Sequence, residues 1–193
     1  MWKGIDVSDN QGTINWAQIP ENVDFAVLRS VRRSGKTDHQ FAANLEGCRE
    51  RNIQVSVYKY TYATTPEAAR QEAQQVVALL QSYGLAGTMI WWDVEDKDVL
   101  RPLGVTKLTE CIRAAQEVVE AAGYGFGLYV GLYVYKERWF DFDAFAGARL
   151  WVARYYHGYH TMQFADEADQ NYKPSVNRWL TAWQYTSCGE IAG

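Results

Sequence analysis

The sequence predicts an α/β fold, an irregular β/α barrel of the TIM type formed by one domain over residues 1–193. Short apolar runs alternate with longer segments of helical periodicity from one end of the chain to the other. Such alternation implies a mostly parallel sheet with crossover helices. Seven candidate strands in 193 residues fit a compact barrel better than a doubly wound sheet. No GxGxxG or Walker motif follows a strand, so a nucleotide site finds no support.

Seven short segments, several of them rich in Val, Ile, Tyr and Trp, are the expected strands. They are residues 2–7, 25–30, 55–60, 89–93, 126–130, 150–154 and 180–185. Between the sixth and the seventh strand, residues 155–177 show neither the alternation of a strand nor the spacing of a helix, and they are expected to form a long loop. We find no internal repeat, linker or low-complexity segment that would divide the chain.

Three helices are predicted between these strands. Residues 38–51 carry apolar side chains at helical spacing. The second helix begins in the run Thr-Thr-Pro-Glu at 64–67, which supplies a cap, a first-turn proline and a capping-box acid, and it extends to about Tyr83. The third helix spans residues 106–122 and is closed by Gly123.

Composition excludes several classes of protein. The formal charge is −4, from 19 basic and 23 acidic residues, and no basic run stands out, which argues against a nucleic-acid partner. The N-terminus enters a strand pattern at once, and no stretch reaches about 18 apolar residues, so neither a signal peptide nor membrane insertion is expected. The 8 Trp, 13 Tyr and 7 Phe exceed the needs of a core, and rings that line a cleft would suit a sugar.

The clearest candidates for chemistry are Asp93 and Glu95, which follow the apolar run Met-Ile-Trp-Trp at 89–92. On a strand these two side chains share a face, with Cα atoms about 6.5 to 7 Å apart. Two acids that close cannot ionise independently, and apolar surroundings raise one pKa further, which leaves a protonated acid at neutral pH. Asp6 would point to the same side as Asp93. The competing interpretation is that all three acids cap loops, form turns or pair with arginines.

In β/α barrels the active site lies at the C-terminal ends of the strands. Acids, tyrosines and amides gather there in this sequence: Asp6, Ser8, Arg29, Ser30, Tyr58, Tyr60, Tyr62, Asp93, Glu95, Tyr129, Arg154, Tyr155, Gln184 and Tyr185. We predict that the substrate contacts Tyr60, Tyr62, Tyr129, Tyr155 and Gln184, although strand tyrosines often serve packing alone.

Metal binding is not expected. The three histidines form no HxxxH or HxH pair, and the acidic run at 93–98 lacks the glycine and the spacing of a calcium loop. A Gly-x-Ser-x-Gly elbow is also absent from the sequence, so serine hydrolysis finds no support.

Together these motifs resemble the glycoside hydrolase family 25 lysozymes, which are muramidases. The matching segments follow the family order at residues 4–8, 11–12, 14, 16, 23–29, 57–60, 93–95, 128–129, 150–153, 155 and 183–187. The resemblance implies an irregular β/α barrel, without metal or organic cofactor. It implies cleavage of the β-1,4 bond between N-acetylmuramic acid and N-acetylglucosamine in bacterial peptidoglycan. It also implies action at the bacterial cell wall, after secretion or after release by lysis, as for an endolysin.

Carried over by position, the resemblance assigns roles to the three acids. Glu95 matches the general acid that protonates the leaving oxygen. Asp93 matches the companion carboxylate, which could orient or stabilise charge on a substrate acetamido group, and Asp6 matches the acid of the first strand. The division agrees with the needs of a glycosidase, which uses one protonated carboxyl and a second anionic feature near an oxocarbenium-like centre.

The sequence departs from the family pattern in two places, and each leads to an expectation about the structure. The family continues after Trp-Gln-Tyr to a last strand with a Val-Asp-x-Asn motif, whereas this chain ends at Gly189-Glu-Ile-Ala-Gly193, so that strand and its acid are absent. An open barrel edge would invite self-association or a partner chain. Lys59 stands where the family often has histidine, and on the outward face it is expected to matter little. Two alternatives remain: a chitinase-like N-acetylhexosamine hydrolase, and a catalytically impaired glycan-binding or structural module.

Overall fold

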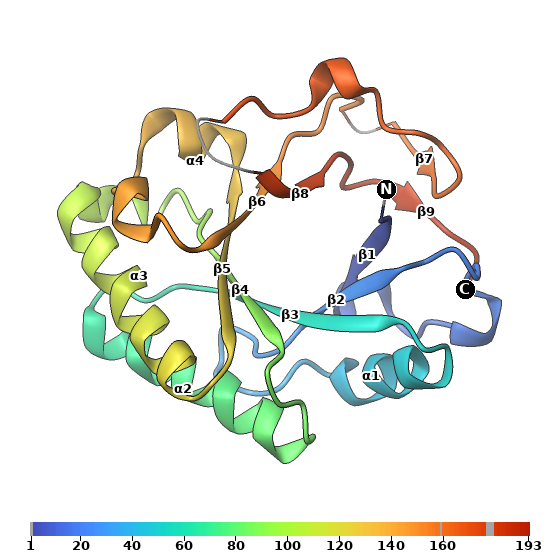
Figure 1. Ribbon diagram of the computed structural model, residues 1–193, viewed down its shortest axis with the longest axis horizontal. Coiled ribbons are helices and arrows are strands. Elements are labelled where there is room, and N and C mark those ends of the chain that lie inside the picture. The colour runs from blue at the N-terminus through green and yellow to red at the C-terminus, as the bar shows by residue number, and fades with distance from the viewer. Residues whose placement is uncertain (1, 159, 177–179) are drawn as a thin grey trace.

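Seven parallel strands form one curled sheet in the computed structural model, which describes residues 2–158, 160–176 and 180–193 (Figure 1). In sheet order they are β1 (Gly4–Val7), β2 (Phe25–Arg29), β3 (Gln54–Tyr60), β4 (Met89–Asp93), β5 (Gly125–Gly131), β6 (Arg149–Ala153) and β8 (Leu180–Gln184). Each corresponds to a predicted strand, and β1 begins two residues later than expected. The predicted α/β barrel-like fold is confirmed.

Helices connect the strands on the outside of the sheet (Figure 1). The three predicted helices are α1 (Phe41–Glu50), α2 (Pro66–Ser82) and α3 (Gly104–Ala121), and a fourth, α4 (Leu132–Glu137), follows β5. Helix α4 was not predicted, because six residues make fewer than two turns, too few to show a helical period. Among the described helices none is both long and apolar enough to cross a membrane.

The start of α2 differs from the prediction in one detail. The side chain of Thr65 accepts a hydrogen bond from the amide of Ala68, and Pro66 is the first helical residue. Glu67 is therefore the second residue of the helix and does not take the capping-box position, which is the third. Its carboxylate instead lies 3.8 Å from the guanidinium of Arg70.

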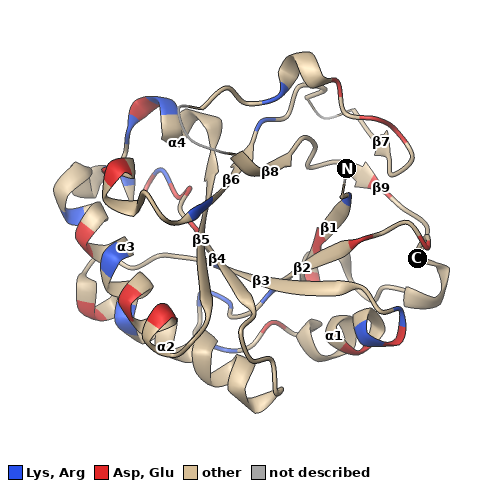
Figure 2. Cartoon of the chain, in the orientation of Figure 1, with Lys and Arg blue, Asp and Glu red and all other residues tan. Residues whose placement is uncertain are grey.

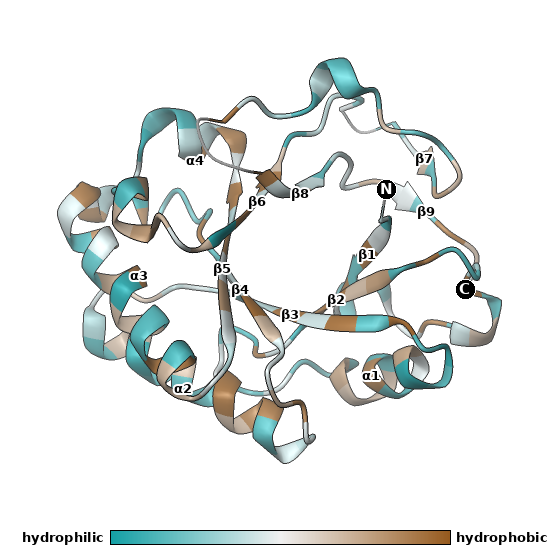
Figure 3. Cartoon of the chain, in the orientation of Figure 1, coloured by the Kyte–Doolittle hydropathy of each residue, from teal (hydrophilic) through white to brown (hydrophobic). Residues whose placement is uncertain are grey.

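Hydrophobic clusters lie on both faces of the sheet. Its outer face packs against α1, α2 and α3 through fully buried residues such as Ile90 and Trp92, and Figure 3 shows hydrophobic and hydrophilic bands alternating along these helices. A second cluster, made mainly of Val27, Trp91, Tyr129, Trp151 and Ala153, lies on the inner face. Large rings fit there because small residues face them. A Cβ atom at Gly127 would lie 2.6 Å from the ring of Trp91.

The sheet is open between its first and last strands. No pairing joins β8 to β1 in the described part of the chain. The two strands are instead connected by a side chain, because Nε2 of Gln184 donates to Oδ2 of Asp6 at 2.7 Å. The short strand β9 (Gly189–Glu190) pairs with β7 (Met162–Gln163) outside the main sheet.

The predicted loop at 155–177 contains more structure than expected. It includes β7 and a 3₁₀ turn at Gln170–Tyr172, while its last residue, Asn177, lies outside the described residues. Lys3 anchors it to the start of the chain by donating from Nζ to the carbonyl oxygen of Asp166 at 2.6 Å. The sequence did not reveal β7 because its partner strand lies 27 residues further along the chain.

Candidate active site

Three carboxyl groups face one cleft on the inner side of the curled sheet. Asp6 belongs to β1, Asp93 is the last residue of β4, and Glu95 lies two residues beyond it. All three line a cavity of about 1570 Å³, together with the predicted tyrosines and Gln184. The structure therefore brings the predicted site residues together at the C-terminal ends of the strands.

Asp93 is the most deeply buried of the three acids, with 4 % of its surface exposed. In the described part of the chain its Oδ1 has no hydrogen-bond partner. Burial raises the pKa of Asp93 well above its ordinary value, and the charges of Glu95 and Asp6 raise it further, against an opposing effect of Lys59. Directly beneath it on the inner face, Trp91 donates from its indole N–H to Ser56 at 3.3 Å.

Glu95 is partly buried at the edge of the cleft. Burial is the main cause that raises its pKa to about 7, and the charges of Asp6 and Asp96 contribute. A carboxyl with that pKa is about half protonated at pH 7. Because Asp93 and Glu95 interact, the pair as a unit retains a proton at neutral pH. The site can thus donate a proton where an ordinary glutamate could not.

Gln184 connects Asp6 to two tyrosines. Its Oε1 accepts from the hydroxyls of Tyr129 at 2.6 Å and Tyr155 at 2.8 Å. The amide nitrogen must therefore face Asp6, to which it donates. Burial raises the pKa of Asp6, and this donated hydrogen bond opposes the rise. Gln184, predicted as a substrate contact, thus has its oxygen and an N–H group engaged within the protein, where it favours an ionised Asp6.

Replacing Gln184 with leucine is expected to lower kcat by about tenfold, because Asp6 loses the donor that favours its ionised form. Two tyrosine hydroxyls lose their acceptor, so the free energy of unfolding should fall by about 1–3 kcal/mol. Both are measurable by initial rates and by chemical denaturation. The matched control is Tyr155→Phe, which removes one of the same hydrogen bonds without changing the donor to Asp6. A leucine variant with wild-type kcat would show that Asp6 does not depend on Gln184.

Tyr60 and Tyr62 form an aromatic wall on the β3 side of the cleft. Their ring centroids lie 4.8 Å apart, and the guanidinium of Arg33 lies 4.4 Å above the ring of Tyr62. Burial raises the pKa of both tyrosines, so their hydroxyls stay protonated. Tyr155 completes the cleft on the β6 side and is 42 % exposed. The tyrosines were predicted from the sequence, whereas Arg33 was not among the predicted site residues.

Lys59 faces outward from the sheet, as expected, but it is not exposed. Its side chain is 1 % exposed and its Nζ lies 3.5 Å from the carboxylate of Glu72 in α2. Glu72 also accepts from the hydroxyl of Thr61 at 2.6 Å and from the amide of Tyr62 at 3.2 Å. A buried ammonium without its partner would be costly. The expectation that Lys59 matters little is therefore wrong for the fold, because it holds the end of β3.

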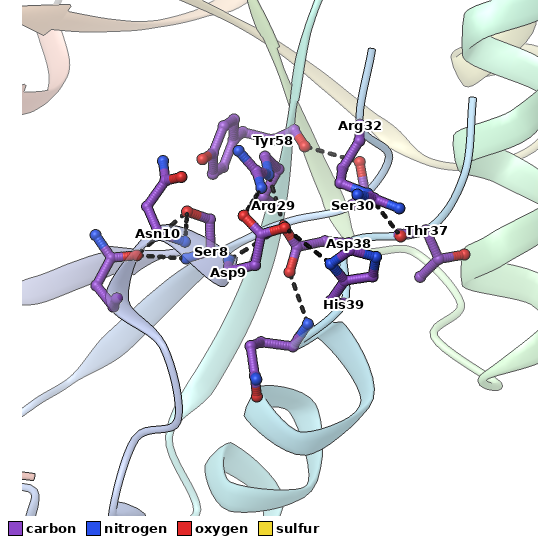
Figure 4. A network of polar contacts seen from close by, with 12 residues as sticks. Ser8, Asp9, Asn10, Arg29, Ser30, Arg32, Thr37, Asp38, His39 and Tyr58 are labelled. Atoms are coloured by element: carbon purple, nitrogen blue, oxygen red, sulfur yellow. Dashed lines mark hydrogen bonds and ion pairs between the residues drawn. The ribbon is translucent and has the colours of Figure 1, made fainter. Parts of the chain in front are cut away.

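A second polar network fixes the end of β1 (Figure 4). Arg29 lies between the carboxylates of Asp9 and Asp38, and its Nε donates to Asp38 at 2.6 Å. Asp38 also accepts from the backbone amides of Asp9 at 3.2 Å and Gln40 at 2.9 Å. The network joins the segment after Asp6 to β2 and to the start of α1. Arg29 is thus neutralised by two acids and braces the site.

Tyr133 was not among the predicted site residues either. This residue of α4 lies beside the candidate acid, and its hydroxyl donates to the backbone carbonyl of Glu95 at 3.0 Å. No sequence signal pointed to it, since α4 itself was not predicted. Within the described ranges no cluster of three or more His, Cys, Asp and Glu is placed to hold a metal ion.

An open β/α barrel with a proton-retaining carboxyl pair at its strand ends and aromatic walls around it has the features of a glycoside hydrolase. Comparison with known families agrees. The chain belongs to the family "Glycosyl hydrolases family 25", whose model matches residues 5–193. No curated protein sequence matches the chain at a significant level.

Solved structures of similar fold support the assignment. The catalytic domain of the endolysin ply40 from bacteriophage P40 of Listeria monocytogenes is 26% identical, with a TM-score of 0.72 over 99% of this chain and 87% of that chain. The modular autolysin LytC from Streptococcus pneumoniae is also 26% identical, with a TM-score of 0.74 over 96% of this chain. The present chain spans only 42% of that autolysin, which has also been solved in complex with a synthetic peptidoglycan ligand.

A bacterial lysozyme from Streptomyces coelicolor shares the fold at 19% identity, with a TM-score of 0.71 over 100% of this chain and 87% of that chain. At that identity the likeness supports the fold alone.

Proposed function

We propose that this chain is a peptidoglycan hydrolase of the lysozyme type, which cleaves the β-1,4 bond between N-acetylmuramic acid and N-acetylglucosamine. The observation that carries the proposal is the carboxyl pair of Asp93 and Glu95, which retains a proton at neutral pH inside an aromatic-lined cleft. Membership of glycosyl hydrolases family 25 and the likeness to an endolysin domain support it.

Glu95 would act as the general acid. Its carboxyl proton passes to the glycosidic oxygen as the bond from that oxygen to C1 breaks, and positive charge develops at C1. Glu95 suits this role better than Asp93 because it lies nearer the cleft surface, where a glycosidic oxygen can reach it. The carboxylate left on Glu95 can then take a proton from the water that attacks C1.

Asp93 would hold the acetamido group of the sugar whose C1 reacts. Its buried Oδ1 lacks a partner among the described residues, and a substrate amide N–H would supply one. A hydrogen bond from that N–H favours the charged form of Asp93, so the proton shared by the pair moves toward Glu95. An acetamide oriented in this way could itself attack C1, in which case the separation of the carboxyl groups does not predict the stereochemistry.

Asp6 would stabilise the positive charge at C1. Gln184 favours the ionised form of Asp6 from the opposite edge of the sheet. The tyrosine walls offer ring faces and hydroxyls to sugars on both sides of the acids. We propose Tyr60, Tyr62, Tyr129 and Tyr155 as the substrate-contacting residues.

Release of reducing ends from purified peptidoglycan and from chitin oligosaccharides tests this function against its rivals. We expect the wild-type chain to release reducing ends from peptidoglycan and to act on chitin oligosaccharides at least about tenfold more slowly, which is the discrimination that about 1.4 kcal/mol provides. Equal or faster cleavage of chitin would favour the chitinase-like alternative. Binding to peptidoglycan without release of reducing ends would favour the impaired glycan-binding module.

We propose the same function for the chain as a whole. Residues 1–193 would act as one catalytic domain, at the bacterial cell wall, on peptidoglycan rather than on nucleic acid, and without a metal or organic cofactor. Acidic and basic residues are mixed along α1, α2 and α3 (Figure 2). The opening between β8 and β1 leaves an edge where self-association or a partner chain could pair, and sedimentation at increasing concentration would detect the former.

A further inference from the structure

Glu95 is not held in place by the sheet. Strand β4 ends at Asp93, and the last main-chain hydrogen bond from this strand to β5 runs from the amide of Val94 to the carbonyl of Tyr129 at 3.0 Å. Beyond Val94 the chain enters a loop. The hydroxyl of Tyr133 reaches this loop and donates to the carbonyl oxygen of Glu95 at 3.0 Å. The contact fixes the peptide group that carries the candidate acid.

Tyr133 is itself held by specific contacts, although 45 % of its surface is exposed. Its ring meets that of Trp139 edge to face, with centroids 5.5 Å apart. Trp139 is 5 % exposed, and its indole N–H donates to Glu137 at 2.8 Å. The contact with this buried ring orients the side chain of Tyr133.

Gly131 provides the space that the ring of Tyr133 occupies. Its backbone angles are φ −65° and ψ 148°, an extended conformation that any L-residue adopts. The backbone therefore does not require glycine at this position. A Cβ atom there, however, would lie 2.3 Å from Cε1 of Tyr133. Even alanine would displace the ring and, with it, the hydroxyl that contacts Glu95.

We propose that Tyr133 is a positioning residue for Glu95, and that residue 131 is glycine so that the ring of Tyr133 can reach the carbonyl of Glu95. The inference rests on the proposed role of Glu95 as the general acid. Proton transfer needs the carboxyl within hydrogen-bond reach of the glycosidic oxygen, and small displacements of a catalytic group lower the rate strongly.

The hydrogen bond from Tyr133 also keeps Glu95 in the buried position that raises its pKa, where the charges of Asp6 and Asp96 raise it further. The titratable groups that interact with Glu95 are Asp6 on β1, Tyr60 on β3, Asp93 on β4, Asp96 on its own loop, Tyr129 on β5, Tyr133 on α4 and Tyr155 after β6. Tyr133→Phe changes no charge among them. A loosened Glu95 would gain water, and its pKa would fall from about 7 toward its ordinary value. In the pH profile of kcat/KM, the alkaline limb would then move to lower pH.

The test compares Tyr133→Phe, Tyr133→Ala, Gly131→Ala and the double variant Gly131→Ala/Tyr133→Ala on purified peptidoglycan. Tyr133→Phe should lower kcat by about threefold to tenfold, the effect of one lost hydrogen bond, with KM unchanged and the alkaline limb shifted to lower pH. Gly131→Ala should likewise lower kcat, leave KM unchanged and shift the alkaline limb to lower pH. In the Tyr133→Ala background, Gly131→Ala should cause no further loss. Tyr172→Phe, at an exposed tyrosine of the loop before β8, is the matched control and should match the wild type.

Two results would overturn the inference. One is a Tyr133→Phe variant with wild-type kcat and pH profile, even if its melting temperature falls, since Tyr133 would then serve stability alone. The other is multiplicative loss in the double variant, because Gly131 would then act independently of the ring. If the wild-type chain releases no fragments from peptidoglycan, the proposed function itself fails, and that outcome is distinct from both.

Discussion

Replacing Glu95 with glutamine is expected to lower kcat on peptidoglycan by about 10²- to 10⁴-fold, the usual contribution of a general acid. Glutamine keeps the size of the side chain but has no acidic proton to donate. Initial rates of reducing-end release at pH 6, where the wild-type acid is mostly protonated, measure the effect. Binding of peptidoglycan should change little, so the loss should appear in kcat and not in KM. A variant that retains more than a tenth of the wild-type kcat would show that another group supplies the proton.

The same variant should be more stable than the wild type at alkaline pH. Burial raises the folded-state pKa of Glu95 from 4.5 to about 7, so the folded protein binds this proton more tightly than the unfolded chain does. The contribution of Glu95 to stability is therefore full below pH 4.5 and is lost as the pH rises through 7. At pH 8 glutamine should raise the free energy of unfolding by up to about 3 kcal/mol, with no gain at pH 4. Denaturation at both pH values checks this, and an equal effect at both would contradict it.

Replacing Asp93 with asparagine is expected to lower kcat by about 10²-fold, because the substrate acetamide loses the negative charge that orients it. The change also removes a charge that interacts with Glu95, so the alkaline limb of kcat/KM should move to lower pH. A pH–rate profile of both variants against the wild type measures the two effects together.

Asp96→Asn is the matched control for Asp93→Asn. The carboxylate of Asp96 lies on the same loop and raises the pKa of Glu95, but it accepts loop amides that asparagine can still satisfy. The control should shift the alkaline limb slightly and leave kcat near the wild-type value. If both asparagine variants lost activity equally, charge near Glu95 alone would explain the site, and the specific role of Asp93 would be refuted.

The strands and three of the helices could be predicted because the apolar residues of each segment recur at a spacing typical of that element. Strand alternation predicted that Asp6 and Asp93 point to the same side, and both line the cleft. Glu95 could be placed near Asp93 for the same reason. The start of α2 was predicted within the run at 64–67, but the capping-box role expected for Glu67 was wrong by one residue, an error within the usual uncertainty of helix boundaries.

Contacts between distant parts of the chain could not be predicted. Gln184 and Asp6 are 178 residues apart, and only the curl of the sheet brings the two edges together. Tyr133 depends on a helix of six residues that shows no period. Lys59 was expected to matter little because an outward position on a strand does not reveal which helix covers it. In each case tertiary packing, which sequence periodicity does not encode, gives the residue its role.

Mass spectrometry of the products from purified peptidoglycan tests the central claim most directly. Digests by the wild type and by Glu95→Gln would be reduced with borohydride before analysis, so that the sugar at each new reducing end is marked. The account predicts muropeptides that end in reduced muramic acid from the wild type and almost none from the variant. Products that end in reduced glucosamine, or equal digestion by both proteins, would contradict it.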